Sequence, residues 1–216
     1  MRTLRNFIIG LILVIGAIVA MLFIPSPQPP AAKPWEVTIM PDGNVQVLGI
    51  HLANTTYKTA QETLGTFGET AIFRDPNNSL SVEAFFNSIN LSGLSAKLVL
   101  NLDVKAEQLE AMLKRATSGK LQPSGAYQHD IAEVDRIALL KTPVNAITYI
   151  PTVRLDETMI MSRFGEPDTK QQTTDPDGVT INSWHYTSSM LTVNFSEKEK
   201  TVLIYRAKST SPDQLK

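Results

Sequence analysis

The sequence contains no cysteine, and this absence excludes several kinds of chemistry at once. Disulfide bonds, thiolate metal sites, cysteine nucleophiles and a lipid-modified N-terminal cysteine all need a thiol. There are only three histidines, His51, His129 and His185, and none has a partner at the His-x-x-x-His spacing of a zinc site. A Gly-x-Ser-x-Gly nucleophile motif and a glycine-rich phosphate loop are also missing. We therefore expect no metal, no cofactor and no catalytic residues, and a protein that is not an enzyme.

Positive charge is scarce in most of the chain. Arg2, Arg5 and Lys33 are the only charged residues among the first 34, which leaves residues 35–216 with a net charge of −4. A surface of this sign repels phosphate groups. The charge balance therefore argues against nucleic acid and against an anionic lipid surface as main partners.

One long stretch lacks charge altogether. Phe7 to Ile24 is a run of apolar residues and glycine, preceded by Arg2 and Arg5. At about 1.5 Å of rise per residue it would form roughly 27 Å of helix, close to the ~30 Å hydrocarbon core of a bilayer. It predicts a single-pass transmembrane anchor over residues 1–24, with a cytoplasmic N-terminus and a periplasmic domain on the inner membrane of a cell envelope. The alternatives are a cleaved signal peptide and a buried helix.

The next segment is dominated by proline. Residues 25–34 read PSPQPPAAKP, and five prolines in ten residues favour an extended polyproline linker. We expect the linker to end at residue 34, a domain to occupy residues 35–208, and residues 209–216 to be a polar tail.

Within the domain, alternating apolar residues predict strands, and capping residues predict the helices between them. Helix starts are indicated at Asn54-Thr55-Thr56, Asp103 and Asp156, and Lys120 to Gly125 reads as a loop. The clearest strand patterns cover residues 71–74, 81–86, 94–102, 144–150, 179–186, 191–195 and 201–205. These patterns together predict an α+β fold.

The chain also resembles itself at an offset of 100 residues. Leu64-Gly65 then matches Phe164-Gly165, and Asp75-Pro76 matches Asp175-Pro176. In each pair a bulky residue would anchor the last helical turn, and glycine would take the left-handed position that follows it. The offset predicts two similar antiparallel-sheet-plus-helix halves, 35–103 and 143–208, joined by a helical connector over 104–142. Two unrelated stretches with the same turn chemistry are the alternative.

A family resemblance rests on the second half. Phe164-Gly165-Glu166-Pro167, Trp184-His185-Tyr186 and the alternating strand Leu191–Phe195 together look like the outer-membrane-assembly lipoproteins of the SmpA/OmlA type. The pattern is similar to β-lactamase-inhibitory protein as well, which carries this unit in tandem. The resemblance implies a helical segment packed on an antiparallel sheet, and a binding or scaffolding module rather than an enzyme.

The candidate binding residues are Phe85 and Phe86. They are neighbours in a predicted strand, so their side chains point to opposite faces and one ring should lie away from the core. The expected function is protein–protein binding or scaffolding, with another envelope protein as partner. A hydrolase with an unrecognised site and a ligand-binding sensor domain are the alternatives.

Overall fold

The computed structural model describes residues 2–22, 32–91, 93–174 and 178–208, in two compact units. The first unit, Met1–Pro30, contains helix α1 (Arg2–Leu22), and the second, Ala31–Lys216, contains all the other elements. Most of the predicted proline linker, residues 175–177 of the second Asp-Pro turn, and the predicted tail 209–216 lie outside the described residues.

Helix α1 corrects the predicted membrane anchor. Among the residues that the structure describes, no helix is both long and apolar enough to cross a membrane. The prediction rested on the whole apolar run from Phe7 to Ile24, of which Phe23 and Ile24 lie outside the described residues. The transmembrane and single-pass predictions are wrong, and the inner-membrane location with a periplasmic domain loses its basis.

The second unit is built mostly of strands. Its helices are α2 (Tyr57–Leu64), α3 (Ala106–Arg115), α4 (Glu133–Leu139) and α5 (Glu157–Phe164). Its strands are β1 (Thr38–Ile39), β2 (Val45–Val47), β3 (Ile50–His51), β4 (Glu69–Arg74), β5 (Leu80–Leu91), β6 (Leu94–Leu102), β7 (Gly119–Leu121), β8 (Tyr127–Asp130), β9 (Val144–Pro151), β10 (Thr169–Thr174), β11 (Thr180–Tyr186), β12 (Leu191–Phe195) and β13 (Val202–Arg206).

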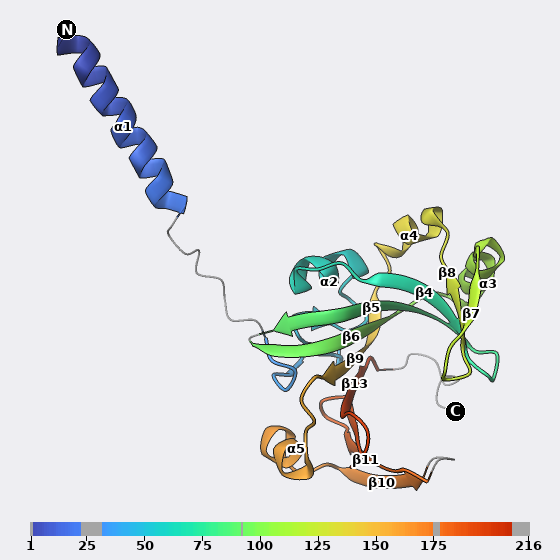
Figure 1. Ribbon diagram of the computed structural model, residues 1–216. Coiled ribbons are helices and arrows are strands. Elements are labelled where there is room, and N and C mark those ends of the chain that lie inside the picture. The colour runs from blue at the N-terminus through green and yellow to red at the C-terminus, as the bar shows by residue number, and fades with distance from the viewer. Residues whose placement is uncertain (1, 23–31, 92, 175–177, 209–216) are drawn as a thin grey trace. The chain divides into compact units, whose positions relative to one another are not determined.

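Ten of these strands form one antiparallel sheet in the order β10-β11-β12-β13-β9-β6-β5-β4-β8-β7 (Figure 1). Strands β1 to β3 form a separate small sheet. The predicted α+β class with two similar sheet-and-helix halves is therefore wrong, since strands from both segments share one sheet. Strand β9 explains the difference: it pairs with β6 along one edge and with β13 along the other. Because both edges of β9 are paired, the sheet continues without a break from one predicted half to the other.

The segment predicted as a helical connector adds strands to this sheet. Between α3 and α4 lies the β7–β8 hairpin, and β8 pairs with β4. A sequence read as a loop over Lys120 to Gly125 thus contains the end of β7 and the hairpin turn. The hairpin extends the sheet beyond β4.

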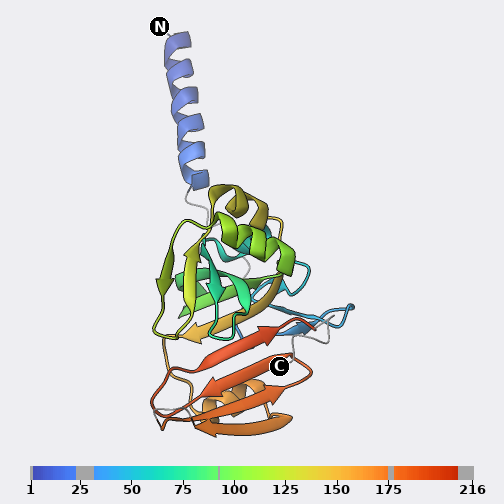
Figure 2. The same cartoon turned by 90° about the vertical axis from the view of Figure 1, so that its right-hand side faces the viewer.

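One face of the sheet forms the core. A row of buried side chains crosses six strands in register, from Phe86 through Leu98, Tyr149, Leu203 and Val193 to Trp184. Helix α2 packs on this face, since its Tyr57 and Ala60 are buried in the same core cluster as Phe86. Helix α5 packs on the same face through the ring contact between Phe164 and Tyr186, and it lies behind the strands in Figure 2. The opposite face is here called the open face.

The two glycines that motivated the duplication both follow an eight-residue helix, α2 or α5. Gly65 has φ 66° and ψ 21°, the left-handed conformation expected for it. Gly165 has a φ of 77° but a ψ of −162°, so it leaves its helix differently. The boundaries 35–103, 104–142 and 143–208 stay a prediction.

Candidate functional site

The three histidines lie on three different strands and do not converge. His185 on β11 shares a 3.1 Å contact between its Nδ1 and the Thr192 hydroxyl, while Trp184 and Tyr186 on either side are buried. His129 on β8 stacks on Tyr127, with ring centroids 6.4 Å apart. Its Nε2 atom is buried and has no hydrogen-bond partner among the described residues. Neither the His185–Thr192 contact nor the His129–Tyr127 contact brings a histidine together with a second acidic or basic side chain.

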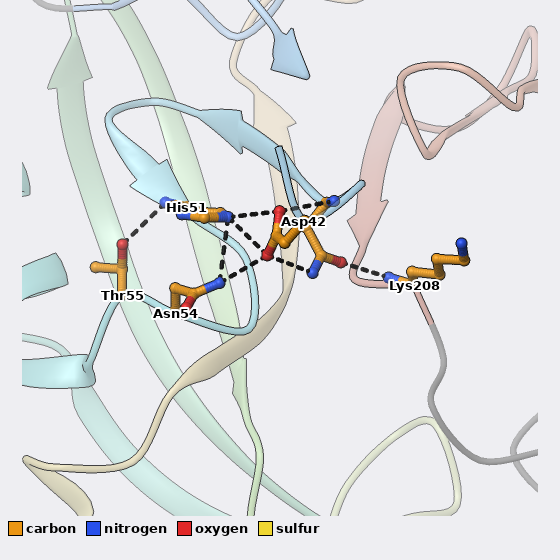
Figure 3. A network of polar contacts seen from close by, with 6 residues as sticks. Asp42, His51, Asn54, Thr55 and Lys208 are labelled. Carbon is orange, nitrogen blue, oxygen red and sulfur yellow. Dashed lines mark hydrogen bonds and ion pairs between the residues drawn. The ribbon is translucent and has the colours of Figure 1, made fainter. Parts of the chain in front are cut away.

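His51 belongs to a polar network in the small sheet (Figure 3). Its Nε2 atom lies 3.1 Å from both carboxylate oxygens of Asp42, and the Asn54 amide donates to one of them at 2.8 Å. Asn44 donates to Asp42 from its backbone and its side chain, and its own side-chain oxygen accepts from the Lys208 amide at 2.8 Å. The Asn44 side chain is the main reason that the pKa of Asp42 falls to about 2, and His51 adds to the shift.

The arrangement of this network indicates a structural role and not a catalytic one. A catalytic Asp–His pair needs a nucleophile on the second ring nitrogen. The nearby Thr55 hydroxyl accepts from the His51 backbone amide at 2.9 Å, so it bonds the main chain and not the ring. The network ties the β1–β2 turn to β3 and to Lys208.

Phe85 and Phe86 separate as alternation predicts. Phe86 is only 3% exposed and lies in the core, so it cannot contact a partner. Phe85 is half-buried on the open face, in register with Glu69 on β4 and Val99 on β6. Of the two candidate binding residues, only Phe85 is available at the surface.

A second aromatic ring joins Phe85 there. Phe73 of β4 lies on the open face as well, and its ring centroid is 5.3 Å from that of Phe85, at an interplanar angle of 56°. Between them in the register lies the pair of Ala71 and Glu83, because Glu69 pairs with Phe85 and Phe73 pairs with Ser81. The two rings therefore lean toward each other over this pair. Their cover explains why Ala71, on the open face, is only 3% exposed.

A groove of about 1270 Å³ surrounds these rings. Its floor consists of open-face residues of β4 and β5, and its walls include the β7–β8 turn and Arg136 of α4. Small-molecule pockets usually measure about 300–1,000 Å³. The groove is thus roomy for a small ligand and large enough for a segment of another chain.

Carboxylates outnumber cations in the groove lining. Glu69, Asp75, Glu83 and Asp130 face a single basic residue, Arg136. Two of the four have local partners: Asp75 accepts from the backbone amides of its own turn, and Asp130 accepts from the Ser118 hydroxyl at 2.5 Å. Glu69 and Glu83 remain for contacts with a ligand.

Glu83 is the unusual member of this set. Its Oε1 atom accepts from the Ser81 hydroxyl at 3.3 Å and from the Asn101 amide at 3.4 Å, both long for hydrogen bonds. Burial raises the pKa of Glu83, and these two hydrogen bonds only partly offset the effect. The register places Glu83 between Phe73 and Phe85 on the open face. Among the described residues, Glu83 thus has two long hydrogen bonds and no ion pair.

Large apolar side chains are exposed at three positions close in sequence to the groove lining. Phe67 immediately precedes the lining residues Gly68 and Glu69 and is 87% exposed. Val134 and Ile137 lie on either side of Arg136 in the sequence of α4 and are 63% and 61% exposed.

The sequence alone indicated Phe85 but missed its neighbours. Phe73, Glu83 and the β7–β8 hairpin come together only through the strand register. An aromatic residue at an outward position of a strand was the one signal available, and it applies to Phe73 as well as to Phe85. Within the described residues, no group of three His, Asp or Glu side chains could hold a metal ion.

Comparison of the chain with protein-family models, with curated proteins and with solved structures found no match. The resemblance to the SmpA/OmlA-type lipoproteins stays a prediction.

Proposed function

We propose that the second unit is a protein-binding module whose groove over β4 and β5 receives a segment of a partner protein. The observation that carries the proposal is the pair of Phe73 and Phe85, two aromatic rings that meet on the open face and not in the core. Aromatic anchors in partly desolvated pockets carry much of the energy in protein interfaces. The size of the groove supports the same role, and so do the exposed apolar residues close in sequence to its lining.

A hydrolase is the second candidate, and one observation favours it. Glu83 lies in the groove and its pKa is raised, as a general acid requires. Against it, Asp75 and Asp130 are engaged in local hydrogen bonds, and the remaining groove carboxylate, Glu69, is in register with Phe85 and not with Glu83. Glu83 therefore has no directly facing carboxylate of the kind that paired-acid hydrolysis uses. Binding a partner segment, by contrast, needs no residue beyond those already in the groove.

Site-specific crosslinking tests the binding proposal. A photoreactive amino acid is placed at Asn87, an exposed groove residue, in the full chain within cells that make the protein. The matched control position is Val153, which is 67% exposed and lies outside the groove lining. We expect one defined protein to crosslink from Asn87 and not from Val153, and the product to disappear when Phe85→Ala is added. Equal products from both positions, or a product unaffected by Phe85→Ala, would overturn the proposal.

A further inference from the structure

The charge of the groove says which kind of segment would bind there. Four acidic residues line the groove against Arg136 alone, and Arg136 already lies 3.8 Å from Glu133. Lys120 on the neighbouring edge strand is in register with the groove residue Gln128 but is not part of the lining. An acidic segment would meet repulsion here, and a basic one would be attracted.

Glu83 gives a second and independent indication. A carboxylate that is half-buried, held by two long hydrogen bonds and flanked in the register by two aromatic residues has lost water without gaining a full set of donors. An arriving ammonium or guanidinium group would supply the missing donors and the opposite charge. The Glu83 carboxylate therefore favours a cationic ligand group over another hydrogen-bond acceptor.

The aromatic pair is compatible with the same ligand. A cation over the face of a phenylalanine ring is attracted by the ring quadrupole, and the methylene stem of lysine or arginine packs on apolar surface. Phe73 and Phe85 therefore accept the stem of a basic side chain while Glu69 and Glu83 accept its head. The exposed Phe67, Val134 and Ile137, close in sequence to residues of the groove lining, suit an apolar neighbour in the same segment.

We propose that the groove binds a basic segment of a partner protein, with lysine or arginine residues next to apolar ones. This inference rests on the proposed function and adds the chemistry of the ligand to it. The central contact is a cationic head at Glu83, with its methylene stem on the rings of Phe73 and Phe85. Glu69, two register positions away and paired with Phe85, provides a second carboxylate for the neighbouring cation.

The test uses three labelled peptides of about twelve residues against the full chain, read by fluorescence polarisation. The first alternates lysine with leucine around one phenylalanine, the second has glutamine for every lysine, and the third has glutamate. We expect the lysine peptide to bind about tenfold or more tightly than the glutamine peptide, and the glutamate peptide not to bind. The advantage of the lysine peptide should shrink as salt is raised, because salt screens partly exposed charges.

Variants locate the binding. Glu83→Gln and Glu69→Gln should each weaken the lysine peptide several-fold and leave the glutamine peptide unchanged. Glu199→Gln is the matched control, an exposed glutamate in the β12–β13 connection that is not among the groove residues. It should change neither peptide. Circular dichroism checks that each variant is folded, and the two groove variants serve as checks on each other.

The outcomes separate the two proposals. If the glutamine peptide binds as tightly as the lysine peptide and Phe85→Ala abolishes both, the groove binds peptides and the basic-segment inference is wrong. If the lysine peptide binds but Phe85→Ala, Glu69→Gln and Glu83→Gln leave it unaffected, the groove is not the site and both proposals fail. Absence of any binding by the lysine peptide also overturns the inference, whatever the crosslinking shows.

Discussion

The ring of Phe73 meets the ring of Phe85 with 5.3 Å between their centroids, although β4 and β5 place them on either side of the Ala71–Glu83 pair. The contact makes one apolar surface from two strands. Glu83 lies between the two aromatic residues in the register, so we expect the rings that could anchor a partner also to shield the Glu83 carboxylate from water. This coupling leads to predictions about acidity, stability and binding.

Removal of one ring should change the acidity of Glu83. Burial is the main cause of the raised pKa of this carboxyl, and Phe85 lies two residues along β5 on the same face. Phe85→Ala admits water, which favours the charged form, so we predict that the pKa of Glu83 falls toward its ordinary value. Carboxyl chemical shifts followed by NMR through a pH titration measure it. Val153→Ala, outside the groove, is the control, and an unchanged Glu83 in Phe85→Ala would show that the ring does not shield it.

Glu83→Gln should make the protein more stable at neutral pH. A carboxyl whose pKa is raised on folding binds its proton more tightly in the folded state than in the unfolded chain. Its contribution to stability is therefore complete below the unfolded pKa of about 4.3 and is lost as the pH rises through the folded pKa. Glutamine keeps an acceptor for Ser81 and Asn101 and carries no charge.

The measurement is thermal melting of both proteins between pH 4 and pH 8. The melting temperature of Glu83→Gln should exceed that of the unchanged protein at neutral pH, and the gap should narrow toward pH 4. Glu199→Gln should show no such gap. A Glu83→Gln variant that is less stable at neutral pH would mean that the carboxylate is better satisfied than its two hydrogen bonds indicate.

Gly68 should not tolerate a side chain. A Cβ at this position would lie 2.8 Å from two atoms of the Phe86 ring and 3.1 Å from the Tyr57 hydroxyl, which donates to the Gly68 carbonyl. Overpacking a well-packed core costs about 1–3 kcal/mol, so Gly68→Ala should destabilise the domain by that amount in chemical denaturation. Gly16→Ala, with nothing within 4 Å of its Cβ, should leave this transition unchanged. A Gly68→Ala midpoint equal to that of the unchanged protein would contradict the packing of α2 on the sheet.

Several elements could be predicted because they follow local rules. Strands β5, β6 and β12 alternate buried and half-buried or exposed residues over much of their length. Helix α2 begins where Thr56 accepts from the Thr59 amide, and α5 begins where Asp156 accepts from the Met159 amide. Capping and alternation depend on residues close in sequence, so a single sequence is enough to see them.

Other elements could not be predicted because long-range pairing creates them. Strand β10 reads TKQQTT and is exposed throughout, so it has no apolar alternation and becomes a strand only by pairing with β11. Strand β7 is exposed throughout as well and depends on β8. Pairing also decided between Phe85 and Phe86, and it brought Phe73 to the site from another strand.

The most direct test of the account is equilibrium binding between the full chain and the partner identified by crosslinking. Phe85→Ala should raise the dissociation constant about thirtyfold or more, as expected for the loss of an aromatic anchor worth about 2 kcal/mol or more. Met159→Ala removes a large apolar side chain that is 41% exposed on α5, away from the groove lining, and should leave binding unchanged. Equal affinities of Phe85→Ala and the unchanged protein, with both folded, would contradict the claim that the groove over β4 and β5 is the binding site.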